Sequence, residues 1–200
     1  VLYQSDGTNH KAIYTFDKSS QHFIYDNNHI LIPSTDEDKN NVLKKINLET
    51  KLCTKEIETP YAFSNLESLN KEGVFLASVY HNPKKEEYDD TLFEIIETIP
   101  FQSNGSGFTQ GKINQLFLVN LEKETYTAIT SDDMTVFSYT LNQDKTKVYI
   151  TASDDLDVFS FYPDLYVYDF EKEKLELLTD QKELSIGNLI PLHEKLFVSA

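Results

Sequence analysis

The chain has 200 residues, with 13 Phe, 12 Tyr and no Trp, and a formal net charge of −15 at neutral pH. A chain this acidic lacks the basic patch that nucleic acid or an anionic membrane surface requires, so we expect neither as a partner. Aromatic and β-branched residues dominate its apolar content, which favours strands. Its single cysteine excludes an intrachain disulfide.

The first recurring pattern along the chain is an apolar triplet that ends in small or hydroxyl residues. The copies begin at Val1, Ile30, Val74, Val148 and Leu196. Polar turns precede the last four copies, at residues 26–29, 70–73, 142–145 and 193–195. A polar turn between apolar runs is typical of a β-hairpin.

The second pattern is a strand that ends in Asp or Asn and is followed by a charged turn. These ends fall at Asp17, Asn47, Asn120 and Asp169, and another alternating run follows each turn. The intervals between successive copies of the two patterns agree along the chain. A unit of roughly 40–50 residues that holds about four strands has the size of a β-propeller blade.

The phased repeat predicts an all-β fold, a partial β-propeller of about four four-stranded blades. The approximate blades are 1–28 (partial), 29–59, 60–130, 131–180 and 181–200 (partial). Residues 39–52 would fit a helix, but their spacing favours a strand. An ordinary β-sandwich also has evenly spaced strands, and the phasing makes us prefer the propeller. Both chain ends fall in strand-like runs, so we expect a fragment of one propeller domain in a longer protein.

One copy of the repeat is interrupted by an insertion at residues 81–112, between the second and third strands of the blade 60–130. A charged run opens the insertion and an apolar run follows. It then carries a compact motif of Pro100, Phe101, Asn104, Gly105, Gly107 and Phe108.

This motif, preceded by Ile99 and followed by Gln-Leu-Phe-Leu-Val-Asn-Leu at 115–121, resembles the propeller of serine peptidases of the prolyl oligopeptidase family. The acylaminoacyl-peptidase-like branch is the most similar. That branch carries a Leu/Ile-Pro-aromatic and a Gly-x-Gly-aromatic insertion before a comparable strand. Ser106 stands between the two glycines, where the family often has a basic residue.

The resemblance implies a non-catalytic, regulatory propeller that covers the active site of a C-terminal α/β-hydrolase domain in the same polypeptide. The propeller would admit short or acylated peptides and exclude folded proteins. The nucleophile would lie outside this chain, and the motif residues would be structural or would line the channel. A cytoplasmic location is expected.

The residues themselves point to no catalytic, metal or cofactor site. Asn104 and Phe108 flank Ser106 where a hydrolase elbow needs glycines. His193 lacks the second histidine of a zinc helix, so we interpret it as a turn residue. Asp154, Asp155 and Asp157 lack the glycine and distal glutamate of a calcium loop, which indicates a solvated loop. Cys53 alternates like a strand residue and is expected to be a buried, inert thiol.

A second interpretation stays open: a stand-alone binding or scaffold propeller, similar to TolB-like or WD-repeat modules, with no enzymatic activity. In either case an incomplete propeller leaves open sheet edges and apolar blade faces, so we expect the isolated chain to self-associate or to fold marginally.

Overall fold

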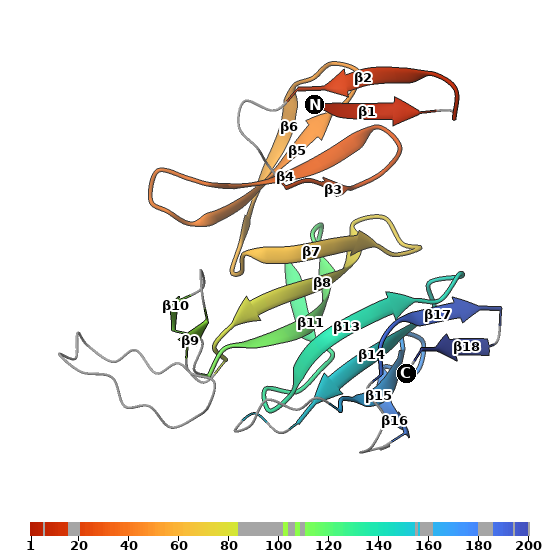
Figure 1. Cartoon of the computed structure of the whole chain (residues 1–200). Coiled ribbons are helices and arrows are strands. Elements are labelled where there is room, and N and C mark those ends of the chain that lie inside the picture. Colours follow the sequence, from red (N-terminus) through yellow and green to blue (C-terminus); the bar gives the residue numbers. More distant parts are fainter. Residues whose placement is uncertain are drawn as a thin grey trace. The chain divides into compact units, whose positions relative to one another are not determined.

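A computed structural model describes residues 1–5, 7–15, 21–83, 102–103, 107–108, 111–154, 156, 162–179, 186–193 and 195–199 (Figure 1). The regular structure in these ranges consists of strands. The same ranges hold no helix long and apolar enough to cross a membrane. The predicted all-β class is therefore confirmed.

Three four-stranded sheets account for most of the strand residues that the structure describes. The first contains β3 (Phe23–Ile24), β4 (His29–Thr35), β5 (Asn41–Asn47) and β6 (Cys53–Thr59). The second contains β7 (Phe63–Ser68), β8 (Val74–His81), β11 (Ile113–Asn120) and β12 (Thr125–Ala128). The third contains β13 (Thr135–Leu141), β14 (Lys147–Ser153), β15 (Asp164–Asp169) and β16 (Lys174–Thr179).

The strands of each sheet follow one another in chain order, as in a propeller blade. Neighbouring strands of the first and third sheets pair antiparallel. The segment that would also fit a helix is instead β5 and the turn after it. The sequence pattern placed the start of this blade at residue 29. The first sheet begins earlier, with β3 at Phe23–Ile24.

Three two-stranded ribbons complete the described structure. They are β1 (Leu2–Ser5) with β2 (His10–Tyr14), β9 (Gln102–Ser103) with β10 (Gly107–Phe108), and β17 (Leu189–Leu192) with β18 (Lys195–Val198). The described residues therefore hold three complete four-stranded sheets of the predicted partial propeller.

The chain divides into two compact units. Unit 1 comprises Val1–Ala77 and Val119–Tyr126, and unit 2 comprises Ser78–Leu118 and Thr127–Ala200. Unit 1 contains the first sheet and unit 2 the third. The second sheet contributes residues to both.

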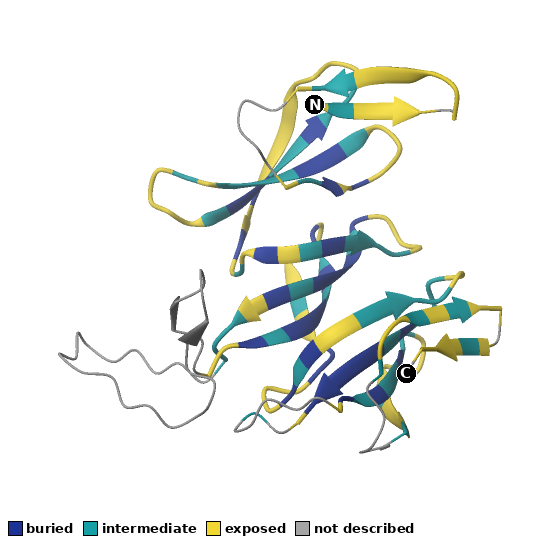
Figure 2. Cartoon of the chain, viewed as in Figure 1, coloured by how far each residue is buried: buried dark blue, intermediate teal, exposed yellow. Residues whose placement is uncertain are grey.

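The middle strands of the sheets hold most of the core, and the last strand of each sheet is mostly exposed (Figure 2). Phe75, Leu76 and Ala77 are consecutive in β8 and all fully buried, so both faces of this strand are covered. In β14, Ile150, Thr151 and Ala152 are likewise consecutive and buried. Burial on both faces explains why these strands read as continuous apolar runs rather than alternating ones.

The strand-ending Asp or Asn residues shape the turns that the repeat predicted. Asp17 lies outside the described residues. At the other three ends the side-chain oxygen accepts hydrogen bonds of 2.9–3.1 Å from the backbone N–H groups two and three residues later, an Asx turn. These acceptors are Asn47, Asn120 and Asp169. Each turn then closes through a residue of positive φ, namely Lys51, Glu124 or Glu173.

A second backbone contact repeats in all three sheets. The N–H after each Asx residue donates to a carbonyl in the preceding hairpin turn: Leu48 to Asn28 at 2.8 Å, Leu121 to Gly73 at 2.9 Å and Phe170 to Thr146 at 3.0 Å. These bonds join the two turns at one edge of each sheet. The polar spacing read from the sequence therefore has a structural cause.

Candidate functional site at the insertion

The insertion lies between β8 and β11, where the sequence pattern placed it. Gly107 and Phe108 form β10, with Gly107 opposite Ser103 and Phe108 opposite Gln102 in β9. The other motif residues, Pro100, Phe101, Asn104 and Gly105, lie outside the described residues. The structure thus places a short hairpin in the insertion.

A polar network centred on a buried glutamine lies in unit 2, where the insertion follows β8 and precedes β11. His81 ends β8, and its Nε2 lies 2.7 Å from Oε1 of Gln115 in β11. Gln115 Nε2 donates to the Thr130 carbonyl at 2.8 Å and to Asp132 Oδ1 at 2.9 Å. Because the amide nitrogen serves these two acceptors, Oε1 faces the imidazole, and His81 Nε2 is the proton donor. Only 1% of Gln115 is exposed.

Contacts around this network hold the two ends of the insertion in place. Thr130 Oγ1 accepts from Leu116 N at 3.1 Å, and the His81 ring lies 5.8 Å from the Phe117 ring in an edge contact. Gly111 has a φ of +68°, and a Cβ there would lie 2.8 Å from Nδ2 of Asn82. A side chain at position 111 would therefore displace Asn82. The close approach of Gly111 to Asn82 keeps the two ends of the insertion near each other.

The chemistry of this network is that of support rather than catalysis. An amide neither gains nor loses a proton at ordinary pH, so Gln115 cannot pass a proton between His81 and Asp132. It instead satisfies hydrogen-bonding groups from three segments. The sequence offered one signal for this role, the polar pair Asn114 and Gln115 directly before the apolar run of β11, but the strand resemblance alone did not reveal it.

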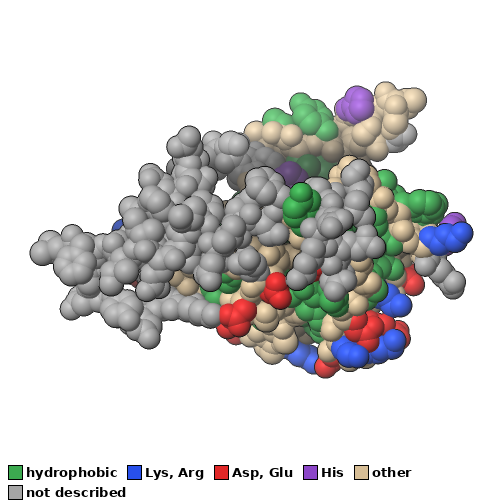
Figure 3. Space-filling view, turned by 60° about the horizontal axis from the view of Figure 1, so that its bottom comes forward, with side chains coloured by type: hydrophobic (Ala, Val, Ile, Leu, Met, Phe, Trp, Pro, Cys, Tyr) green, Lys and Arg blue, Asp and Glu red, His purple; other side chains and the backbone are tan. Residues whose placement is uncertain are grey.

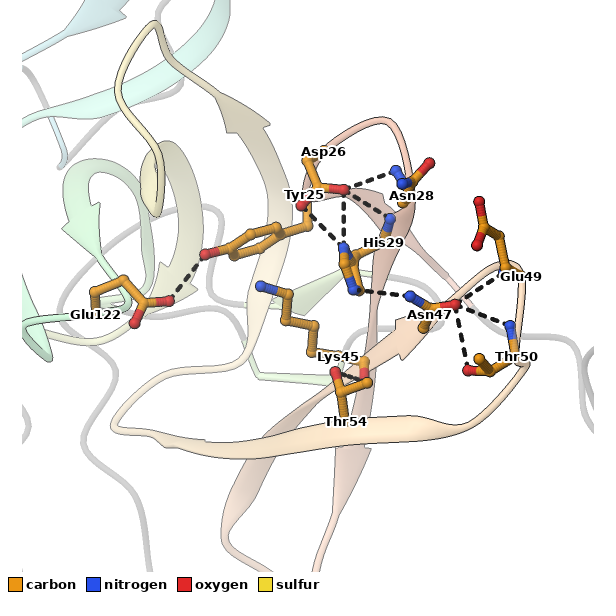
Figure 4. Close-up of polar contacts among 10 residues, drawn as sticks. All are labelled: Tyr25, Asp26, Asn28, His29, Lys45, Asn47, Glu49, Thr50, Thr54 and Glu122. Carbon is orange, nitrogen blue, oxygen red and sulfur yellow. Dashed lines mark hydrogen bonds and ion pairs between the residues drawn. The ribbon is translucent and has the colours of Figure 1, made fainter.

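A second polar cluster lies in unit 1, around the turn that precedes β4 (Figure 4). His29 Nδ1 lies 2.9 Å and 3.0 Å from the two carboxylate oxygens of Asp26, and its Nε2 lies 3.2 Å from Asn47 Nδ2. Asn47 Oδ1 accepts the hydrogen bonds of the turn that follows β5, so Asn47 Nδ2 is the group that donates to the His29 ring. Burial acts to raise the pKa of Asp26, but hydrogen bonds from Asn28 and His29 outweigh it and hold that pKa below its ordinary value.

Tyr25 connects this turn to the turn between β11 and β12, also within unit 1. Its hydroxyl donates to Glu122 Oε1 at 2.9 Å, and Lys45 Nζ lies 3.5 Å from the centre of its ring (Figure 4). Burial, then the hydrogen bond to Glu122, raises the pKa of Tyr25 well above its ordinary range. The phenol therefore stays a donor, and the cluster is a structural link between two turns.

The remaining candidate residues fall where the chain's turns and edges place them. His193 lies in the turn between β17 and β18, as predicted, with a φ of +53°. Asp154 is exposed, whereas Asp155 and Asp157 lie outside the described residues. Among the residues that the structure describes, no group of three or more His, Cys, Asp or Glu could hold a metal ion.

The expected burial of Cys53 is wrong, because its side chain is exposed. Cys53 begins β6, an edge strand whose buried positions are Ile57 and Thr59. Alternation along an edge strand does not bury each apolar position, because no further strand or layer covers its start.

No known protein-family model and no curated protein sequence matches the chain. Solved structures do match. An acylaminoacyl peptidase in complex with Z-Gly-Gly-Phe-chloromethyl ketone aligns with a TM-score of 0.58 and 16% identity, over 86% of this chain and 26% of that one. The Pyrococcus horikoshii acylaminoacyl peptidase (orthorhombic crystal form) aligns with a TM-score of 0.59 and 14% identity, again over 86% of this chain and 26% of that one. A prolyl endopeptidase structure aligns with a TM-score of 0.57 and 13% identity, over 99% of this chain and 28% of that one.

The chain is therefore a set of β-propeller blades. Its fold is similar to part of the acylaminoacyl peptidase and prolyl endopeptidase structures, and it spans about a quarter of the length of those chains. At 13–16% identity this likeness concerns the fold. It agrees with the family resemblance carried by the insertion motif.

Proposed function

We propose that this chain is part of the non-catalytic propeller of a serine peptidase of the prolyl oligopeptidase family, from the acylaminoacyl-peptidase-like branch. The observation that carries the proposal is the fold likeness over 86–99% of the chain to two kinds of peptidase in this family. The insertion supports it, because it interrupts the sheet between β8 and β11 and carries the motif that resembles this branch.

In this proposal the chain's task is access control. A catalytic α/β-hydrolase domain in the same polypeptide supplies the nucleophile, and the propeller admits short or acylated peptides while excluding folded proteins. Backbone-paired sheets suit a filter because they are rigid, so selection by size needs no conformational change. The proposal includes a location in the cytoplasm, which fractionation of the native cells would test.

The deciding experiment uses the native polypeptide that contains this chain. We expect a fluorophosphonate probe to label one serine outside residues 1–200. We also expect hydrolysis of an acylated dipeptide nitroanilide, and no cleavage when the same residues are part of a folded protein. A polypeptide that is neither labelled nor active would refute the peptidase assignment. It would favour the stand-alone binding propeller instead.

A further inference from the structure

A cavity of about 860 Å³ lies within unit 2, between the β13–β14 turn and the β17–β18 hairpin. Its lining combines amide, acidic, basic and apolar side chains: Asn142, Gln143, Asp144, Leu192, His193, Lys195 and Phe197. Charges of both signs therefore face one space.

The acidic side of the cavity is built by the β13–β14 turn. Asp144 Oδ1 accepts from Thr146 Oγ1 at 2.7 Å and from Thr146 N at 3.2 Å. These bonds hold the pKa of Asp144 below its ordinary value, so the group is a carboxylate at neutral pH. Asn142 fixes the turn by accepting from Lys147 N at 2.9 Å and donating to Thr146 Oγ1 at 3.1 Å.

The basic side comes from the β17–β18 hairpin. Neither the Lys195 nor the His193 side chain has an ion pair or hydrogen bond to another residue of the described part of the chain. Lys195 stands opposite Leu192, and Phe197 stands opposite Ile190 on the same face of the hairpin. Figure 3 shows a His and a Lys side chain beside hydrophobic ones at the right-hand edge of the molecule.

These groups discriminate among ligand classes. The Lys195 ammonium disfavours a metal cation, and the Asp144 carboxylate disfavours a simple anion, because like charges repel at close range. A zwitterion satisfies both. Leu192 and Phe197 are about half exposed, at 51% and 53%, so an apolar side chain that covered them would remove their surface from water.

We propose that this cavity binds a free amino acid or short peptide with an apolar side chain. The ligand carboxylate would lie against Lys195 and His193, its ammonium group against Asp144, and its side chain over Leu192 and Phe197. The site is inferred from the cavity alone and does not depend on whether the parent polypeptide is a peptidase.

The test titrates L-leucyl-L-leucine into the 200-residue chain and follows saturation-transfer difference NMR. We expect saturable binding with a Kd on the order of 1 mM, as for a ligand of this size in an open site. Lys195→Ala and Asp144→Asn should each weaken binding about fivefold, since each removes one charge contact worth up to about 1 kcal/mol. Lys195→Arg should stay within about threefold of the wild type, since it keeps the charge.

Two controls make the result decisive. Lys174→Ala removes a lysine that pairs with Glu176 on β16, outside the cavity lining, and should leave binding unchanged. N-acetyl-L-leucyl-L-leucine amide lacks both charges and should bind at least tenfold more weakly. The proposal is overturned if this neutral compound binds equally well. It is also overturned if the Lys195 and Asp144 variants, shown to be folded by circular dichroism, bind like the wild type, or if the wild type gives no saturable signal.

Discussion

Single residues set the geometry at the root of the insertion. Gln115 has hydrogen-bond partners at His81, Thr130 and Asp132 while being almost entirely buried. A buried polar group contributes to stability only while its partners remain, and their loss leaves several groups without a bond.

Gln115→Leu tests this role. We expect a loss of about 2–3 kcal/mol in the free energy of unfolding, because the Thr130 carbonyl and the His81 N–H lose their partner in a buried place. Urea titration measures the change. Gln143→Leu makes the same substitution on an exposed side chain and should shift stability by less than about 0.5 kcal/mol. Equal effects at both positions would show that the Gln115 network is unimportant.

Asp169 adds a charge to a turn that uses asparagine in the other two sheets. Hydrogen bonds from Lys172 N and Glu171 N, together with the Lys172 and Lys147 ammonium groups, hold the pKa of Asp169 below its ordinary value. A carboxyl whose pKa is lowered by folding stabilises the protein above its unfolded-state pKa, near 4. That contribution disappears as the pH falls through the folded-state value.

The pH dependence of Asp169→Asn follows from this sign. The variant keeps the Asx turn but loses the charge, so it should melt at a lower temperature than the wild type at pH 6.5. The gap should narrow as the pH falls below about 4, because protonation removes the charge of Asp169 in the wild type as well. Thermal melts above and below that pH measure it, and 0.5 M NaCl should narrow the gap at pH 6.5 by screening the lysines. A gap that widened on acidification would contradict the assignment.

At the scale of elements, the same type of turn follows the third strand of each of the three sheets. Lys51, Glu124 and Glu173 each adopt a positive φ, of 60°, 53° and 51° respectively. Side chains with a Cβ disfavour this conformation, so each turn carries local strain that the Asx hydrogen bonds offset.

Replacing one of these residues by glycine should relieve the strain. We expect Glu173→Gly to raise the free energy of unfolding by about 0.5 kcal/mol, the relieved strain minus the extra entropy of glycine in the unfolded chain. Chemical denaturation checks it. Glu171→Gly, two residues earlier in the same turn, should instead destabilise slightly, because it gains only the entropy penalty. If Glu173→Gly is the more destabilising of the two, the strain account fails.

At the scale of the whole molecule, sheet edges stay unpaired among the strands that the structure describes. β16 is an edge strand, and its consecutive Leu177 and Leu178 are about half exposed, whereas the exposed side chains of β6 are mostly polar. The register shifts near these leucines, where β16 accommodates an extra residue against β15. An apolar edge is a place where a second copy can add a strand.

We therefore expect the 200-residue chain to self-associate as its concentration rises, in sedimentation velocity runs. Leu178→Lys should shift the distribution towards monomer, because a charge on an edge strand opposes strand addition. Thr127→Lys, on the exposed edge strand β12, adds the same charge without removing a leucine and should change little. A wild type that stays monomeric at all concentrations, or a Leu178→Lys chain that associates equally, would rule out this edge.

The sequence by itself determined the parts of this protein that depend on near neighbours. The Asx turns at Asn47, Asn120 and Asp169 are closed by bonds that span two or three residues, so their spacing is visible in the chain, and with it the four-stranded unit. The insertion was located in the same way, by the interruption of that spacing.

Only the tertiary structure decided what depends on distant residues. The exposure of Cys53 follows from its place at the start of an edge strand, and the role of Gln115 follows from partners 15 to 34 positions away. The cavity between residues 142–144 and 192–197 likewise joins two turns far apart in the chain. Burial and long-range hydrogen bonds depend on which strands pack together, and the spacing of residue types along one chain does not specify that packing.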